Sequence, residues 1–197
     1  DTASLQSVPG EKYLYSNLGM GILGIALTEI AQIPYDSGRG YEQLLREKIL
    51  DPLGLEETGI FLAEEELARM AQPHTVLGTT YPVWEFDALA ACGALKSTNR
   101  DLTRYMAAAM GQLPCSDALS AAFDEACRLH FTGDGAKTGL GFMLDKLPGG
   151  QTYCWHDGSS GGSRAALLFC RETGKGVVVL CNNAVYDLGV SLLAAMH

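Results

Sequence analysis

Two short segments of this 197-residue chain combine side chains that can transfer protons. The first is Tyr15-Ser16-Asn17, which stands just before a stretch with the apolar spacing of a helix. In an extended segment, residues two apart point the same way, so Tyr15 and Asn17 would face one cleft while Ser16 faces away. The alternative is structural: a turn with Asn17 as the helix N-cap and Tyr15 packed on the core. The triplet is too common by itself to decide between the two.

The second segment is WHDGSSGGS, residues 155–163, in which His156 ends a predicted strand. Glycines at 158, 161 and 162 would let the backbone approach a ligand closely and adopt positive φ. The alternative is a flexible hairpin loop that carries an incidental histidine. The length and richness of the segment are unusual, because a plain hairpin needs neither three glycines nor three serines.

The elements that would position the first segment are mostly helical. Thr98 is predicted to cap a helix, because Asp101 follows it at the capping-box spacing. Pro52 would stop an earlier helix, and residues 72–92 have no clear period and are predicted to be loop. The predicted helices cover residues 18–32, 41–50, 63–71, about 97–110 and 116–130.

The second segment lies in a part of the chain that is typical of β-structure. From about residue 139, four short β-rich stretches alternate with turns, which predicts an antiparallel meander. Residues 187–197 predict a closing helix. The fold class is therefore α+β, with a mostly helical subdomain over residues 1–138 and a sheet-plus-helix part over residues 139–197.

Composition and charge narrow the function classes. A formal net charge of −9 argues against nucleic acid or an anionic membrane surface as the partner, because both need a basic patch. The most apolar stretch, residues 18–33, is interrupted by Glu29 and is too short to cross a bilayer. No signal peptide is visible, and the sequence does not indicate a compartment.

The six cysteines form no C-x-x-C pair and give no support for a zinc site. Cys170 and Cys181 flank a predicted hairpin turn whose pairing sets Cys170 opposite about Val177. No bridge between them is therefore expected, and the six thiols are expected to be free. A metal hydrolase is an unrelated alternative, but the spacing of its candidate ligands matches no metal motif; they are His74, His130 and His156.

The two segments, with two others, resemble the serine β-lactamase and penicillin-binding-protein superfamily, in its class C β-lactamase and esterase branch. PGEKYLYSNLGMGILG looks like that branch's Pro-Gly … Tyr-x-Asn segment. HDGSSGG looks like its third motif, which is Lys-Thr-Gly in β-lactamases and His-x-Gly in many relatives. REKILDPLGLEETGI resembles the branch's helix that runs into a Pro-Leu-Gly turn. ACGALKSTNRDLTRYMAAAM resembles the branch's Gly-Gly-x-x-Ser-Thr … Asp-Leu helix. Each motif is weak alone, but the four occur in the family's order from about residue 8 to about residue 184.

The resemblance implies a β-lactamase/transpeptidase-like fold and an acyl-enzyme mechanism that needs no cofactor or metal. In this superfamily a Ser in a Ser-x-x-Lys motif attacks a carbonyl carbon. Tyr15 would be the acid–base partner, activated by the positive charge of that Lys and of protonated His156, and Asn17 would hold the Lys and the substrate amide. The Ser159 N–H would be an oxyanion-hole donor, and Gly158 would leave room for the substrate beside the strand.

Asp157 and Ser160 would also border the substrate, which would be an ester, a D-amino-acid peptide or a β-lactam. Asp157 departs from the β-lactamase pattern, in which Thr is usual. A carboxylate there would repel the carboxylate of a penicillin, and His156 in place of Lys weakens the same recognition. Both changes favour an esterase or peptidase-like hydrolase over a β-lactamase proper.

No serine in the chain is followed by Lys three residues later, so the family's nucleophile is not in these 197 residues. The chain is expected to be the C-terminal portion of a longer hydrolase and inactive alone. The alternative is a relative that binds a ligand or partner without turnover. An incomplete fold would expose a sheet edge and apolar surface, so we expect it to bind the missing N-terminal segment or to self-associate.

Overall fold

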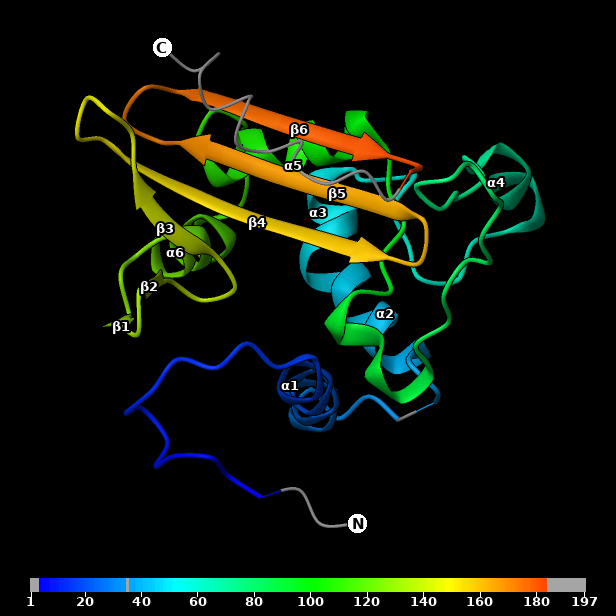
Figure 1. Ribbon diagram of the computed structural model, residues 1–197, viewed down its shortest axis with the longest axis horizontal. Helices are drawn as coiled ribbons and strands as arrows, with labels where there is room; N and C mark the ends of the chain where they lie inside the picture. Colours follow the sequence, from blue (N-terminus) through cyan, green and yellow to red (C-terminus); the bar gives the residue numbers. More distant parts are fainter. Residues whose placement is uncertain (1–3, 35, 184–197) are drawn as a thin grey trace.

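An antiparallel sheet backed by helices organises the chain, as the computed structural model shows for residues 4–34 and 36–183 (Figure 1). The predicted α+β class is confirmed; the closing helix predicted at residues 187–197 lies outside the described residues. The helical elements are α1 (Asn17–Ile30), α2 (Arg39–Leu45), the π-helical turn η1 (Arg46–Leu50), α3 (Asp51–Leu53), α4 (Glu64–Arg69), the 3-10 helix η2 (Asp87–Cys92), α5 (Asn99–Ala109) and α6 (Asp117–Ala126). The strands are β1 (Phe131–Gly133), β2 (Ala136–Thr138), β3 (Met143–Lys146), β4 (Thr152–Ser160), β5 (Ser163–Cys170) and β6 (Lys175–Cys181).

The strands form one sheet in chain order, and each pairs antiparallel with the next. The predicted meander is confirmed, but the sheet begins at Phe131, before residue 139, because two short strands follow α6. The prediction that His156 ends its strand is wrong. β4 continues to Ser160, and only Gly161–Gly162 forms the loop before β5.

The β5–β6 turn corrects the predicted pairing of the cysteines. Cys170 lies opposite Lys175 and not opposite Val177, because residues 171–174 alone make the turn. Cys181 lies opposite Arg164, at the other end of β5, so a bridge between Cys170 and Cys181 is not possible in this register. All six cysteines belong to the described residues, and each is a free thiol.

Alternation along the strands sorts side chains between the two faces of the sheet. Cys154 and Phe169, which lie opposite each other on β4 and β5, face the helices and pack in the main core with Leu53 and Met106. The next pair along the strands, Trp155 with Leu168, faces the other side. In Figure 1, α3, α5 and α6 lie behind the sheet, on its helix-facing side.

The first turn of α1 is capped by a different residue from the one predicted. Ser16 is the N-cap, and its hydroxyl accepts a hydrogen bond from the Gly19 N–H at 2.9 Å. Asn17 is instead the first residue of the helix. Ser16 has an extended backbone, with φ −145° and ψ 107°. In an extended segment, successive side chains point to opposite sides, so Tyr15 and Asn17 lie on the side opposite the Ser16 hydroxyl.

α1 buries its small residues and exposes its large ones. A Cβ at Gly21 would lie 2.4 Å from the Leu89 side chain, and one at Gly24 would lie 2.2 Å from the Cβ of Ala91. Glycine at both positions therefore allows α1 to pack closely against η2. No helix in residues 4–34 and 36–183 is both long and apolar enough to span a membrane. The large apolar residues left exposed on α1 are Leu18, Met20, Ile22, Leu23, Leu27 and Ile30.

The second predicted helix does not stop at Pro52 but continues to Leu53. The π-helical turn η1, in which the Asp51 N–H donates to the Arg46 carbonyl, comes just before the proline. Pro52, which has no N–H to donate, directly follows this wider turn within the continuous helical segment. Gly54 then ends the helix with a left-handed φ of 63°.

Three predicted segments differ in extent from the observed elements. The acidic helix at residues 63–71 and the helix at residues 116–130 are observed as the shorter α4 and α6. The loop predicted over residues 72–92 ends in η2, so that prediction is wrong for its last six residues. A helix of that length shows no period in the sequence, and its packing against α1 stabilises it instead.

The start of α5 forms a buried polar network. Thr98 caps the helix as predicted, because its hydroxyl accepts a hydrogen bond from the Asp101 N–H at 3.2 Å. The Asp101 carboxylate, only 2% exposed, turns instead toward the segment after α3. One of its oxygens accepts from the Glu57 N–H and from the Thr58 hydroxyl, each at 2.8 Å. Asp101 therefore joins α5 to the segment that follows α3.

We expect Asp101→Ala to lower the free energy of unfolding by about 2–4 kcal/mol, because it leaves the Glu57 N–H and the Thr58 hydroxyl without their acceptor. Urea unfolding followed by circular dichroism measures the change. Asp117→Ala is the matched control, since Asp117 is an exposed acidic residue in the first turn of α6, and it should cost no more than about 1 kcal/mol. Equal losses in the two variants would contradict the role given to Asp101.

Candidate active site

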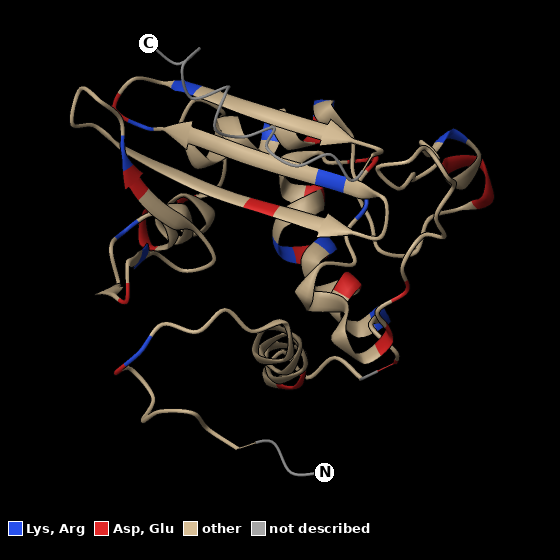
Figure 2. Cartoon of the chain, in the orientation of Figure 1, with Lys and Arg blue, Asp and Glu red and all other residues tan. Residues whose placement is uncertain are grey.

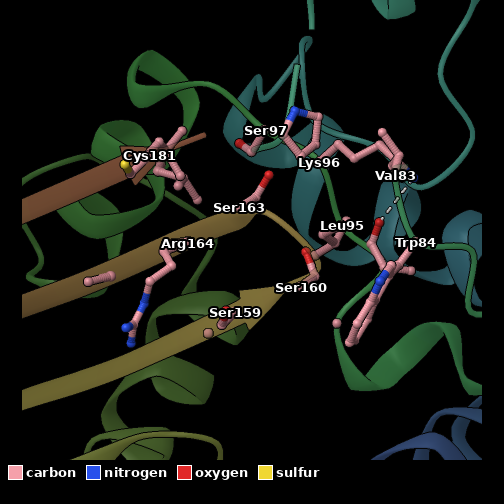
Figure 3. Close-up of a pocket in the computed structure, with 18 of the residues that line it drawn as sticks. Val83, Trp84, Leu95, Lys96, Ser97, Ser159, Ser160, Ser163, Arg164 and Cys181 are labelled. Carbon is pink, nitrogen blue, oxygen red and sulfur yellow. Dashed lines mark hydrogen bonds between the residues drawn. The ribbon is translucent and has the colours of Figure 1, made fainter. Parts of the chain in front are cut away.

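A cleft of about 760 Å³ opens between helical and loop segments on one side and the ends of β4 and β5 on the other. Figure 3 shows the part where Ser160 and Ser163, at the end of the β4–β5 hairpin, lie across from Ser97 and Lys96. Both segments singled out in the sequence border this one cleft. The seven predicted site residues are all among its lining: Tyr15, Asn17, His156, Asp157, Gly158, Ser159 and Ser160.

Tyr15 and His156 meet across the cleft although they come from different parts of the chain. Their ring centroids are 6.4 Å apart, with the rings inclined at 33°. Tyr15 is 58% exposed and lines the cleft. Asn17 lines the same cleft from the first turn of α1. The arrangement therefore places a phenol, an imidazole and an amide around one space.

The β4–β5 turn fixes which main-chain groups face the free edge of β4. With the two-residue loop Gly161–Gly162, Ser160 and Ser163 form the hydrogen-bonded pair that closes the hairpin. Antiparallel pairs alternate, so Ser159 belongs to a non-hydrogen-bonded pair and its N–H points away from β5. Within the described part of the chain, β3 pairs with β4 only as far as Trp155, so no strand uses that N–H. The Ser159 N–H is available to an oxygen of a ligand.

Two of the glycines in this hairpin are required by packing. Gly161 has φ +53°, and a Cβ there would lie 2.6 Å from the Tyr81 ring. A Cβ at Gly162 would lie 2.5 Å from the backbone nitrogen of His74, whose N–H donates to the Gly162 carbonyl at 3.2 Å. The turn is thus docked against the segment that carries Tyr81 and Trp84, and Trp84 lines the cleft beside it (Figure 3). The turn is therefore packed against a neighbouring segment instead of projecting into solvent.

Gly158 is different from the two turn glycines. It lies within β4, its φ is not positive, and a Cβ there would meet nothing within 4 Å. Neither the backbone nor the packing requires glycine at this position. The open space beside Gly158 borders the cleft, next to the outward-pointing Ser159 N–H.

The Asp157 carboxylate does not share a face with His156. Successive residues of β4 alternate, and Asp157 lies opposite Ala166, which belongs to the cluster on the other side of the sheet. There the Arg164 guanidinium donates to the carboxylate at 3.2 Å. In Figure 2, an acidic (red) segment of β4 lies near a basic (blue) segment of β5. The repulsion expected between Asp157 and a substrate carboxylate is therefore offset by Arg164.

Several polar residues of the cleft were not identified from the sequence, and Lys96, Ser97 and Arg164 are among them. The Lys96 ammonium donates to the Ile60 carbonyl at 2.7 Å, and partial burial lowers the pKa of Lys96. The Ser97 hydroxyl is hydrogen-bonded to that of Thr58 at 2.8 Å. Lys96 and Ser97 lie within the segment that resembles Gly-Gly-x-x-Ser-Thr, which is the signal that could have found them.

The histidines of the alternative metal hydrolase lie at separate places. His74 contacts the β4–β5 turn, His130 lies 3.2 Å from a Glu125 carboxylate oxygen, and His156 faces Tyr15. Within residues 4–34 and 36–183, no group of three or more His, Cys, Asp or Glu is placed to hold a metal ion.

Solved structures share this fold. A β-lactamase/D-alanine carboxypeptidase from Pseudomonas syringae superposes with a TM-score of 0.86 at 19% sequence identity, covering 98% of this chain and 61% of that one. The predicted β-lactamase/transpeptidase-like fold is thus confirmed. The sequence profile of the Beta-lactamase family matches residues 1–192, and the chain therefore belongs to that family.

Two curated relatives illustrate the range of the family. A β-lactamase from Pseudomonas fluorescens is 25% identical over 204 residues, which cover 88% of this chain and 55% of that protein. The D-alanyl-D-alanine-carboxypeptidase/endopeptidase AmpH of Escherichia coli K12 is 31% identical over 105 residues, covering 53% of this chain and 25% of that protein. The chain spans about half the length of the first relative and matches a quarter of the second.

Substituting Gly162 and Gly158 in turn by Ala tests whether packing requires glycine at each position. Gly162→Ala should lower the free energy of unfolding by about 1–3 kcal/mol, because its methyl group would overlap the His74 backbone. Gly158→Ala should leave stability unchanged or raise it by about 0.5 kcal/mol, because its methyl group enters open space. Urea unfolding compares the two. Equal destabilisation would show that Gly158 is also needed for packing.

Proposed function

We propose that this chain is the C-terminal part of a serine acyl hydrolase, which forms an acyl-enzyme with an ester, a D-amino-acid peptide or a β-lactam. The observation that carries the proposal is the pairing of Tyr15 with His156 across one cleft, with ring centroids 6.4 Å apart. The outward-pointing Ser159 N–H lies on the same cleft. The nucleophile would come from a Ser-x-x-Lys segment outside these 197 residues, which hold no such motif.

Proton transfer would centre on Tyr15. Its phenol would take the proton of the nucleophile and return it to the leaving group. A phenol keeps its proton at neutral pH, so this role needs positive charge nearby. The Lys of Ser-x-x-Lys and the protonated ring of His156 would supply that charge. Asn17, on the same side of the helix start, would hold the Lys and bind the amide of the substrate.

Stabilisation of the developing oxyanion would depend on β4. The Ser159 N–H is one donor, and it needs no rearrangement because the hairpin already directs it outward. The space beside Gly158 would let the acyl group lie along the strand edge. Ser160 would add a hydroxyl on the cleft face. Asp157 would border the substrate through its main chain, since its carboxylate pairs with Arg164 on the other face.

The substrate class follows from the charge in the cleft. His156 stands where β-lactamases carry Lys, and a histidine offers less fixed positive charge to a carboxylate at neutral pH. This favours an ester or a D-amino-acid peptide over a penicillin. The name of the E. coli relative describes action on D-alanyl-D-alanine ends, which supports the peptide as a candidate.

A non-catalytic relative that binds a ligand or partner is the second candidate. The observation that favours it is the absence of Ser-x-x-Lys from these 197 residues. The two candidates differ in whether the gene encodes Ser-x-x-Lys before Asp1. Reading the upstream coding sequence therefore separates them before any assay is run.

We expect the 197-residue chain alone to show no turnover of p-nitrophenyl acetate or nitrocefin, because it lacks the nucleophile. A protein that includes an upstream Ser-x-x-Lys should react with a fluorophosphonate. In that protein, Tyr15→Phe should lower kcat/KM by roughly 10²- to 10⁴-fold through loss of proton transfer. Steady-state kinetics measure the change.

Tyr13→Phe is the matched control, because the Tyr13 hydroxyl contacts the Met143 sulfur at 3.5 Å and does not border the cleft. It should keep kcat/KM within about twofold of the unchanged protein. Turnover by the isolated chain that Tyr15→Phe abolishes would contradict the proposal. So would equal effects of the two Phe substitutions.

We also propose that the apolar face of α1 binds the missing N-terminal segment, or a second copy of the chain when that segment is absent. Leu18 is 49% exposed, Ile22 is 55% exposed and Ile30 is 78% exposed. On the same helix Gly21 and Gly24 are buried against η2, whereas these three large side chains are left exposed. An exposed apolar face of this kind marks an interaction surface. The free edge of the sheet is a second such surface.

The isolated chain should therefore self-associate, with a weight-average mass at least about twice that of the monomer at about 100 μM. Leu18→Gln combined with Ile22→Gln should shift it toward monomer in static light scattering. Val76→Gln combined with Leu77→Gln is the matched control, since those residues are 57% and 89% exposed on a loop away from α1. A monodisperse monomer at this concentration would contradict the proposal.

A further inference from the structure

Two cysteine thiols lie in contact beneath α6, away from the candidate active site. Cys127 is the C-cap residue of α6, and Cys154 lies on β4 with 4% of its surface exposed. Both belong to the core between helices and sheet, and their side chains are hydrogen-bonded to each other. Neither takes part in a disulfide, and neither has a role in the proposed acyl transfer.

The surroundings of the pair make the two thiols unequal. The hydrogen bond from Cys154 lowers the pKa of Cys127, and the guanidinium of Arg171 lowers it further, against the opposing effects of partial burial and of Asp124. Arg171 is held beside the pair by its 2.5 Å ion pair with Asp124 of α6. Cys127 is also partly accessible, whereas Cys154 is buried. The hydrogen bond with Cys127 and the burial of Cys154 both raise the pKa of Cys154. The reactive thiolate therefore forms at Cys127.

We propose that Cys127 and Cys154 are a redox-sensitive pair that a peroxide converts into a disulfide between α6 and β4. The Cys127 thiolate attacks one oxygen of hydrogen peroxide, the O–O bond breaks, and the departing hydroxide takes up a proton to become water. The sulfenic acid left on Cys127 is then attacked by the Cys154 sulfur, and its S–O bond breaks. The oxygen leaves as a second water with the proton of Cys154. Two thiols and one peroxide thus give one disulfide and two waters.

The other cysteines lack this combination of features. Cys170 is fully buried and lies on the opposite face of the sheet. Burial raises the pKa of Cys92 in the cleft. Cys115 packs against the same core as the pair, and Cys181 is at the end of β6. Selectivity for one pair among six thiols therefore follows from the contact between Cys127 and Cys154 and from the Arg171 charge.

The disulfide would act on the strand that carries the candidate site. Cys154 and His156 are two residues apart on β4 and share its helix-facing side. A covalent bond from α6 to Cys154 would fix this part of β4 against the helices. It would also restrict the unfolded chain and so stabilise the folded state.

The test is peroxide oxidation of the folded 197-residue protein at about equimolar hydrogen peroxide. The protein is then denatured with iodoacetamide, reduced, labelled with N-ethylmaleimide and digested for mass spectrometry. We expect maleimide on Cys127 and Cys154 together, and carbamidomethyl on the remaining four cysteines. The midpoint of thermal unfolding should rise by about 5–10 °C on oxidation.

Single substitutions separate the role of Cys127, which reacts with peroxide, from that of Cys154, which then closes the disulfide. In Cys154→Ser, dimedone should trap a sulfenic acid on Cys127; in Cys127→Ser, Cys154 should stay reduced at the same dose. Cys115→Ser is the matched control and should leave the pairing unchanged. Oxidation of another pair first, or unreacted Cys127 and Cys154, overturns the proposal. A second measurement does not depend on the variants: the unchanged protein is oxidised in urea, where it is unfolded. If Cys127 and Cys154 still pair selectively in urea, the folded structure does not cause the selectivity and the proposal is overturned.

Discussion

The register of β4 against β5 is the constraint on which the candidate site depends. A slip of one residue would exchange the faces of His156 and Asp157, so the cleft would receive a carboxylate in place of an imidazole. The two-residue turn Gly161–Gly162 sets this register, and the contact of Gly162 with His74 holds the turn in place. The same register directs the Ser159 N–H outward. Turn geometry, rather than side-chain chemistry, thus decides what the cleft presents.

The other half of the site depends on how closely α1 approaches η2. Gly21 and Gly24 permit that approach. The position of α1 in turn fixes the positions of Tyr15 and Asn17, because these residues lie at the start of the helix. A larger residue at either glycine would push the helix outward and move the Tyr15 ring away from His156. The small residues of α1 therefore position chemistry at its N-terminus, while its large apolar residues remain available to another segment.

Local signals predicted part of this architecture from the sequence. The Thr98 cap and the meander were predicted because capping and alternation act over a few residues. The N-cap at Ser16 was missed because Ser and Asn are equally good caps, and only the backbone path distinguishes them. β1 and β2 are three residues each, too short for a period. The ion pair of Asp157 depends on register, which residue types alone do not determine.

The exposure of Tyr15, 58% of the residue, bears on the proposed proton transfer. A cation and a phenolate separated by the 6.4 Å between the Tyr15 and His156 rings attract each other by about 0.6 kcal/mol in water, but by about 2.6 kcal/mol at an effective dielectric constant of 20. In the proposed mechanism, positive charge would therefore act on the Tyr15 phenol far more strongly when water is excluded. Leu14 and Leu18, both exposed, flank Tyr15 at the start of α1. A segment that covers this apolar face would also cover Tyr15, so that burial of α1 and activation of the phenol would be a single event.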